Sequence, residues 1–181
     1  MNLDNICGIT EGKENMKLPV RAFNKKILRQ IIEDSFHAQL NEEYMPFLIE
    51  NDAIAYMDLQ YRGVAIVLPH PAGGVLPHLK TLAVLPEHQG NHIGKALMYS
   101  VSEGYRRKLN WRSKPDRKAN KLYNELAGKG KLFTNVEGIP YFGYFINHTT
   151  KEKRAALDYM AKQPDSFEKA EIPTPQPLLT S

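Results

Sequence analysis

The hydrophobic residues of this 181-residue chain change their spacing along its length, and the changes predict alternating helices and strands. Over residues 22–35 they recur at helical intervals among Lys and Glu residues, which predicts an amphipathic helix. A second, short helix is expected over residues 41–48, with Asn41 as its cap. Apolar runs then predict three strands, at residues 53–57, 63–68 and 79–85.

The second half of the chain continues the alternation. The expected elements are, in order, a helix at 94–108, a strand at 109–113, a helix from 116 or 119 to 127, an aromatic-rich strand at 141–146 and a helix at 151–162. Together with the first half, this order predicts one mixed α/β domain.

The two ends of the chain have a different composition from the centre. Residues 1–19 are polar, with Gly and Asn between them, and we expect a loose leader there. Residues 168–181 contain several prolines, so we expect a disordered Pro-rich tail. The folded domain is therefore expected over residues 20–167.

Composition narrows the class of protein. Hydrophobic residues make up 42% and charged residues 24%, which is ordinary for a soluble globular domain. Cys7 is the single cysteine, which excludes an internal disulfide framework and a cysteine-based zinc site. No apolar run approaches the roughly 18 residues of a membrane span, and no secretory signal is visible, so we expect a cytoplasmic protein.

Positive charge is concentrated in one stretch. The whole chain has a net charge of +4, whereas residues 106–131 contain ten basic residues and only two acidic ones. Such a stretch suits a polyanion, either nucleic acid or a phosphate-bearing cofactor. A solvated helix face is the alternative, and charge alone does not decide between them.

The strand at 79–85 leads through a polar glycine loop into the next helix. A strand, loop and helix in this order leave backbone N–H groups unpaired at the helix start, where they can bind a pyrophosphate. The residues that we expect to bind it are Gln89, Gly90, Asn91, His92, Ile93, Gly94, Lys95 and Ala96. A tight structural turn is an equally good explanation of the glycines alone.

Two sequence motifs resemble those of a known family. Gln89-x-x-x-x-Gly94, after a strand that ends in Ala-Val-x-Pro-Glu, resembles the coenzyme A loop of the GCN5-related N-acetyltransferase (GNAT) superfamily. Asp116-x-x-Ala119-x-x-Leu-Tyr123 resembles its second signature. More narrowly, the segment Leu-Asn-Trp-Arg-Ser-Lys at 109–114 resembles the acetyltransferase domain of N-acetylglutamate synthases of the vertebrate and bifunctional bacterial type.

This resemblance implies a fold, a cofactor and a reaction. The GNAT fold is a mixed sheet with flanking helices whose two central parallel strands splay apart, here 79–85 and 109–113. Acetyl-coenzyme A would be the cosubstrate, and its pantetheine arm would lie along Leu82, Ala83 and Val84. Tyr123 matches the family's proton donor to the departing thiolate. A tyrosine that only packs on the core is the alternative.

The resemblance also implies an acceptor and the residues that hold it. The acceptor is expected to be a small amine, an amino acid like glutamate, which would place the chain in arginine biosynthesis. We expect Arg112, Lys114, Asn120 and Thr81 to contact it, because basic side chains clamp carboxylates. Surface charge beside Trp111 is the alternative for the two basic residues.

Three positions depart from the family pattern. His92 lies where the superfamily has the first glycine of its loop. Thr81 aligns with a strand lysine, and Lys80, one residue earlier, is expected to point to the opposite face. A further basic residue of the family aligns near Ala38 or Gln39. The identity of the acceptor therefore stays open.

Three functions remain at this stage. The first is acetyl transfer to a small amine, with no metal, nucleic acid or membrane involved and with a homodimer left open. The second is a non-catalytic module of the same fold that binds coenzyme A. The third is nucleic-acid binding through residues 106–131, which ranks last because few aromatic residues lie among the basic ones.

Overall fold

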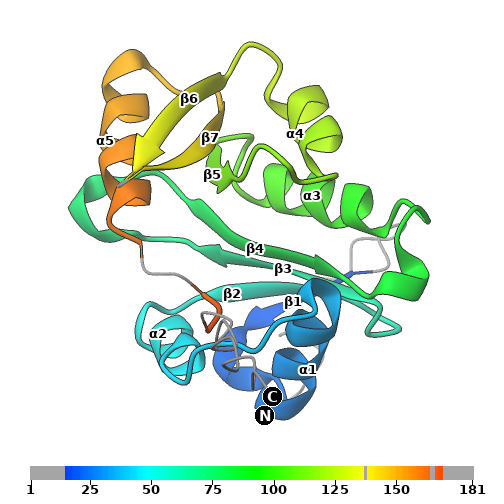
Figure 1. Cartoon of the computed structure of the whole chain (residues 1–181). Coiled ribbons are helices and arrows are strands. Elements are labelled where there is room, and N and C mark those ends of the chain that lie inside the picture. Colours follow the sequence, from blue (N-terminus) through cyan, green and yellow to red (C-terminus); the bar gives the residue numbers. More distant parts are fainter. Residues whose placement is uncertain (1–14, 137, 164–165, 169–181) are drawn as a thin grey trace, which may run out of the picture.

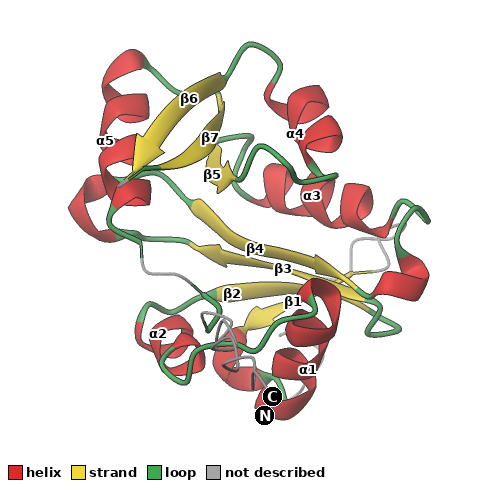
Figure 2. Cartoon of the chain, in the orientation of Figure 1, coloured by secondary structure: helices red, strands yellow, loops and turns green. Residues whose placement is uncertain are grey.

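The computed structural model describes residues 15–136, 138–163 and 166–168. One seven-stranded sheet, in the order β1-β2-β3-β4-β5-β7-β6, crosses the molecule with helices on both faces (Figure 1, Figure 2). The strands are β1 (Asn15–Pro19), β2 (Ile54–Asp58), β3 (Gly63–Leu68), β4 (His78–Val84), β5 (Leu109–Ser113), β6 (Lys131–Val136) and β7 (Ile139–Ile146). The α-helices are α1 (Lys25–Phe36), α2 (Tyr44–Glu50), α3 (Ile93–Gly104), α4 (Asn120–Ala127) and α5 (Thr150–Ala161).

Most elements lie where the hydrophobic spacing predicts them, and two strands do not. Residues 15–19, expected in the loose leader, form the edge strand β1 against β2. Strand β6 was not predicted, because Leu132, Phe133 and Asn135 are exposed and its apolar spacing is weak. The rest of the expected leader and the expected tail beyond residue 168 lie outside the described residues.

Helix boundaries follow local hydrogen bonding. The Asn24 side chain accepts bonds from the N–H groups of Lys26 and Ile27, which begins α1. Asn41 does not cap α2, because the N-cap residue of this helix is Glu43. The Glu43 side chain makes no capping hydrogen bond. Helix α3 ends at Gly104 rather than 108, because Arg106 and Arg107 both have positive φ.

The sheet separates two hydrophobic clusters. One face packs against α1 and α2, around residues such as Leu28, Leu48 and Ile66. The other packs against α3 and α4, around Leu97 and Trp111. Strand β3 lies between the clusters and is buried along its whole length, which makes the centre of the sheet a rigid platform. Within the described residues, no helix is long and apolar enough to cross a membrane.

Candidate active site

Strands β4 and β5 separate near the middle of the sheet. They pair in parallel only through His78↔Asn110 and Leu79↔Trp111. Beyond Leu79, β4 pairs only with β3, and β5 pairs only with β7. The facing edges of the two strands therefore carry backbone N–H and C=O groups that have no strand partner in the described part of the chain. This confirms the splayed sheet.

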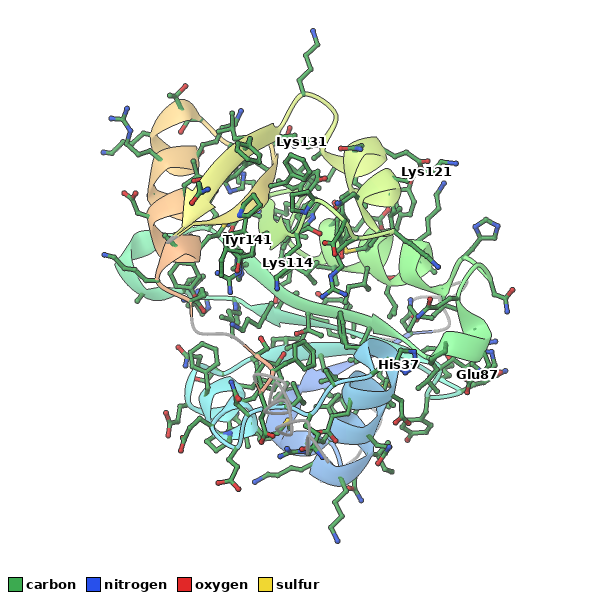
Figure 3. The ribbon with its side chains drawn as sticks, in the orientation of Figure 1. His37, Glu87, Lys114, Lys121, Lys131 and Tyr141 are labelled. Atoms are coloured by element: carbon green, nitrogen blue, oxygen red, sulfur yellow. The ribbon has the colours of Figure 1, made fainter. Side chains whose placement is uncertain are left out.

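A cavity of about 370 Å³ lies at this gap. Its walls come from segments far apart in the sequence, and they are Phe36, residues 78–82, residues 111–114, Arg117, Ala119, Tyr123, Tyr141 and residues 166–168. Lys114 and Tyr141 both lie at the gap, whereas Lys121 of α4 lies on the outer side of the molecule (Figure 3). The cavity opens to both faces of the sheet, because Trp111 and Tyr123 belong to one hydrophobic cluster and Phe36 packs against the other.

The start of α3, after the loop from β4, presents backbone donors. Gly90 has φ +91°, a conformation that glycine adopts without strain. Helix α3 begins at Ile93, and Ala96 is the first residue whose N–H bonds back to His92 O, at 2.9 Å. The N–H groups of the first turn therefore have no acceptor within the helix, which makes this end suitable for an anion.

Some of the residues that we expected to bind the cofactor have side chains that a cofactor cannot contact. The side chains of Ala83 and Ile93 are buried in the two hydrophobic clusters, so only their backbone groups can take part. Gln89 Nε2 donates to Val84 O at 3.1 Å, which ties the loop to the end of β4. Gln89 therefore shapes the loop.

His92 stands in the left-handed region, with φ 60°, as the N-cap residue of α3. This conformation explains why a glycine suits the position, since other residues are strained there. Histidine is one of the side chains that enters this region more often than most. The imidazole is exposed and makes no capping bond, so it stands free at the helix start.

Tyr123 lies on α4 with its ring in an aromatic group at the base of the gap. Its ring centroid is 5.4 Å from that of Trp111 and 5.5 Å from that of Tyr144. Burial raises the pKa of the Tyr123 phenol above its usual range, and Tyr144 adds to the rise. The phenol therefore keeps its proton at neutral pH while lining the cavity.

Asn120 begins α4 and fastens the loop before it. Its Nδ2 donates to Lys114 O at 2.8 Å and to Pro115 O at 3.0 Å. These two bonds fix the orientation of the amide, and Oδ1 is left buried with no hydrogen-bond partner among the described residues. A buried acceptor without a donor is rare, so this atom is a candidate contact for a ligand.

A β-bulge changes the direction in which Lys80 points. In the β3–β4 ladder, Thr81 pairs with Ile66 and Leu79 pairs with Val67, so Lys80 is the extra residue. Lys80 Nζ lies 5.3 Å from the centroid of Phe47, and the Thr81 hydroxyl bonds to that of Tyr44; both partners belong to α2. The expectation that Lys80 points to the opposite face from Thr81 is therefore wrong.

Arg112 and Lys114 both line the cavity, but they are held differently. Arg112 Nη1 donates to Met160 O at 2.7 Å and Nη2 to Gln163 O at 3.3 Å. Its guanidinium carbon also lies 4.9 Å from the Tyr141 ring centroid. Much of its donor fork thus holds the end of α5 to the sheet, whereas Lys114 is exposed at the cavity.

The sequence did not reveal the buried pair of His78 and Asn110. Asn110 Nδ2 donates to the carbonyls of Leu76 and Pro77, so its Oδ1 accepts from His78 Nδ1 at 2.8 Å. Burial lowers the pKa of the His78 imidazole to about 3, so it stays neutral in the cavity wall. The strand register that brings the pair together has no local sequence signal.

The sequence also did not reveal that the described residues 166–168 close one side of the cavity. Phe167 forms a bridge with Leu40, and its ring centroid lies 4.9 Å from that of Phe36. The Arg117 guanidinium carbon also lies 5.7 Å from the Phe36 ring centroid. An aromatic rim therefore joins α1, the loop before α4 and the end of the described chain.

The basic stretch at 106–131 does not form one continuous surface. Lys108 lies 3.6 Å from Glu152, and Lys131 Nζ lies 3.6 Å from the Phe142 ring centroid. Arg112, Lys114 and Arg117 instead line the cavity. With Lys80 they give its walls four cationic side chains against one carboxylate, that of Glu168. This charge favours an anionic ligand inside the molecule.

Comparison with known proteins adds a family match. A family model described as "NAT, N-acetyltransferase, of N-acetylglutamate synthase" matches residues 15–162. The mitochondrial N-acetylglutamate synthase of Danio rerio is 25% identical over 145 residues, which are 77% of this chain and 26% of that protein. The chain thus spans about a quarter of the length of this curated relative.

Solved structures share the fold. The diaminobutyrate acetyltransferase EctA of Paenibacillus lautus gives a TM-score of 0.54 at 16% identity, over 76% of this chain and 98% of that chain. A Desulfovibrio desulfuricans protein described as a GNAT-family acetyltransferase gives 0.53 at 18% identity, over 72% and 96%. Arabidopsis thaliana NAA60 gives 0.52 at 18% identity, over 75% and 99%. The seven-stranded splayed sheet is thus the GNAT fold.

Proposed function

The chain belongs to the N-acetyltransferase family of N-acetylglutamate synthase, and from this we propose that it acetylates the amino group of a small, carboxylate-bearing amine such as glutamate. The observation that carries the proposal is the cavity at the β4–β5 gap, where a buried tyrosine and four cationic side chains meet. Acetyl-coenzyme A would supply the acetyl group as a thioester, and the products would be the N-acetylated amine and a free thiol.

The residues present fit that cosubstrate. The buried, unpartnered Asn120 Oδ1 suits an amide N–H, and the pantetheine arm contains amides. The unpaired edge of β4, from Leu82 to Val84, offers further backbone donors and acceptors. The first turn of α3, beginning at Ile93, would hold the diphosphate through backbone N–H groups. The N–H groups of Gln89 and Asn91 already donate to Pro86 O and His88 O.

Two groups would act on the reacting atoms. Tyr123 would hold a proton at Oη for the departing sulfur, and burial keeps the phenol protonated by raising its pKa. The N–H groups on the free edge of β4, next to the bulge at Lys80, would stabilise negative charge on an oxygen placed against them. His78 is neutral because burial lowers its pKa to about 3, so it adds no repulsion toward an ammonium group.

The acceptor would be held by the cations of the cavity. Lys80 would replace the strand lysine that Thr81 lacks, because the bulge turns both residues toward α2. Lys114, the residue after β5, would bind a second carboxylate. Arg112 would act mainly through the wall that it holds, since it already bonds two carbonyls at the end of α5.

A thiol-release assay tests the proposal. The protein is incubated with acetyl-coenzyme A and a panel of amines that contains glutamate, glutamine, ornithine and a peptide amino terminus. We expect release with glutamate to exceed release with glutamine, because the cavity walls are cationic. No release with any acceptor, together with measurable coenzyme A binding, would instead support the non-catalytic module.

A further inference from the structure

The indole N–H of Trp111 is a buried donor that has no hydrogen-bond partner among the described residues. Trp111 is 1% exposed and lies on β5 at the last rung where β5 still pairs with β4. Tyrosine and tryptophan polar groups usually find a partner when they are buried, because an unpaired donor loses its bond to water. Packing on Tyr144 and Tyr123 explains the buried ring but gives its N–H no partner.

The surroundings of the indole limit where its N–H can find a partner. One face of the ring stacks on Tyr144, with 11° between the planes, and Tyr123 approaches at a steep angle. Trp111 also lines the cavity, together with Tyr123. A ligand that enters the gap would thus meet this donor beside the proposed proton donor.

The side of the sheet decides which ligand group lies there. Trp111 and Tyr123 belong to the cluster beneath α3 and α4, which also contains Leu82 and Val84 of β4. The acceptor cation Lys80 instead contacts α2, and Arg112 contacts the end of α5, on the other face. The Trp111 donor is therefore on the side of the cosubstrate and away from the acceptor's carboxylates.

We propose that Trp111 Nε1–H donates a hydrogen bond to an amide carbonyl oxygen of the cosubstrate's pantetheine arm. This inference rests on the proposed function, because it assumes that the arm occupies the gap. A carbonyl that leaves water needs a donor, and the indole N–H is a donor without a partner among the described residues. Trp111 would thus be a binding residue for the arm and would report on its presence.

Because Trp111 is the single tryptophan, its indole gives one isolated cross-peak in a ¹⁵N–¹H spectrum. We expect coenzyme A to shift this peak and to slow its exchange with water. Adenosine 3′,5′-bisphosphate, which lacks the pantetheine arm, should leave the peak in place. A peak that stays unmoved while calorimetry records coenzyme A binding would overturn the inference and leave the proposed function standing. Absence of any coenzyme A binding would overturn both.

A variant measures the contribution of the bond. Trp111→Phe keeps an aromatic ring and removes the donor, so the Kd for coenzyme A should rise about fivefold to tenfold. The Kd for adenosine 3′,5′-bisphosphate should not change. The matched control is Tyr144→Phe, which removes a neighbouring hydroxyl bonded to Asn124 and leaves the indole intact; its Kd should stay within twofold of the wild type.

A second replacement keeps the test valid if Trp111→Phe does not fold. Biosynthetic incorporation of benzothienylalanine exchanges the N–H for sulfur with almost no change of shape, and the single tryptophan makes the exchange specific to this position. The same rise in the Kd for coenzyme A is expected. An unchanged Kd would show that the N–H has no partner in the cosubstrate.

Discussion

The two sides of the sheet at the β4–β5 gap are assembled in different ways. The side beneath α3 and α4 is built from one continuous stretch, from Leu79 to Tyr123, in the order strand, loop, helix, strand, helix. The other side is built from α1, the β4 bulge, β5 and residues 166–168, which lie far apart in the sequence. The first side would hold the cosubstrate and the second the acceptor. Continuous assembly makes the first side recognisable as a motif, while the second depends on tertiary packing.

The largest expected effect is a loss of kcat when Tyr123, on the cosubstrate side of the gap, is replaced. Tyr123→Phe should lower kcat about 100-fold, because the variant loses the proton that the departing sulfur requires. Burial raises the pKa of this phenol, so the wild type should not lose activity through its ionisation near neutral pH. Steady-state thiol release measures the effect, and the Kd for coenzyme A is the control. A kcat within threefold of the wild type would reduce Tyr123 to a packing residue.

The next effect should appear in stability rather than in chemistry. Arg112→Lys removes the fork that bonds the carbonyls of Met160 and Gln163, so the free energy of unfolding should fall by about 2 kcal/mol. Urea unfolding measures the change.

The control for this prediction is Lys114→Met, which changes a cavity cation that is exposed and should leave stability nearly unchanged. If Arg112→Lys instead keeps full stability and raises only the KM for the acceptor, the guanidinium is a direct carboxylate clamp. Side chains on both sides of the gap would then contact a ligand directly.

A smaller effect is expected on the KM for the acceptor when Lys80, the extra residue of the bulge, is replaced. Lys80→Met should raise the KM for the acceptor about tenfold and leave the Kd for coenzyme A unchanged, because the lost charge faces only the acceptor side. Lys121→Met is the matched control, since it removes one exposed charge from α4. Equal effects of the two variants would mean that general charge, and not Lys80, attracts the acceptor.

The smallest effect is expected at the helix start. His92→Gly should raise the free energy of unfolding by about 0.5 kcal/mol, because relief of the left-handed conformation is partly offset by greater freedom in the unfolded chain. Thermal unfolding measures this change. If the Kd for coenzyme A rises in the same variant, the imidazole itself contacts the phosphates.

The same difference between the sides explains what could be predicted from the sequence. Strand β4, the start of α3 and Tyr123 on α4 lie in regular elements whose spacing is visible along the chain, so they were predicted, although the helix expected at 94–108 ends at Gly104. The splay also followed, because it belongs to the family fold. Strand β6 was missed since an exposed edge strand has little apolar periodicity.

What could not be predicted depends on contacts between distant residues. The direction of Lys80 follows from a bulge that only the pairing with β3 reveals. The role of Arg112 follows from carbonyls that lie 48 and 51 residues later in the chain. The pairing of His78 with Asn110 requires the register of two parallel strands. None of these has a signal within a few residues.

The bulge at Lys80 also affects how this chain is compared with its relatives. An alignment assigns residues to columns by their order in the chain. In a strand, side chains point alternately to the two faces of the sheet, and one extra residue at a bulge shifts this alternation. A strand with one extra residue can therefore carry a functional equivalent in the neighbouring column, and a column-by-column reading records it as a loss. For relatives of this chain, the residues on both sides of the strand lysine column should be read together before a carboxylate contact is declared missing.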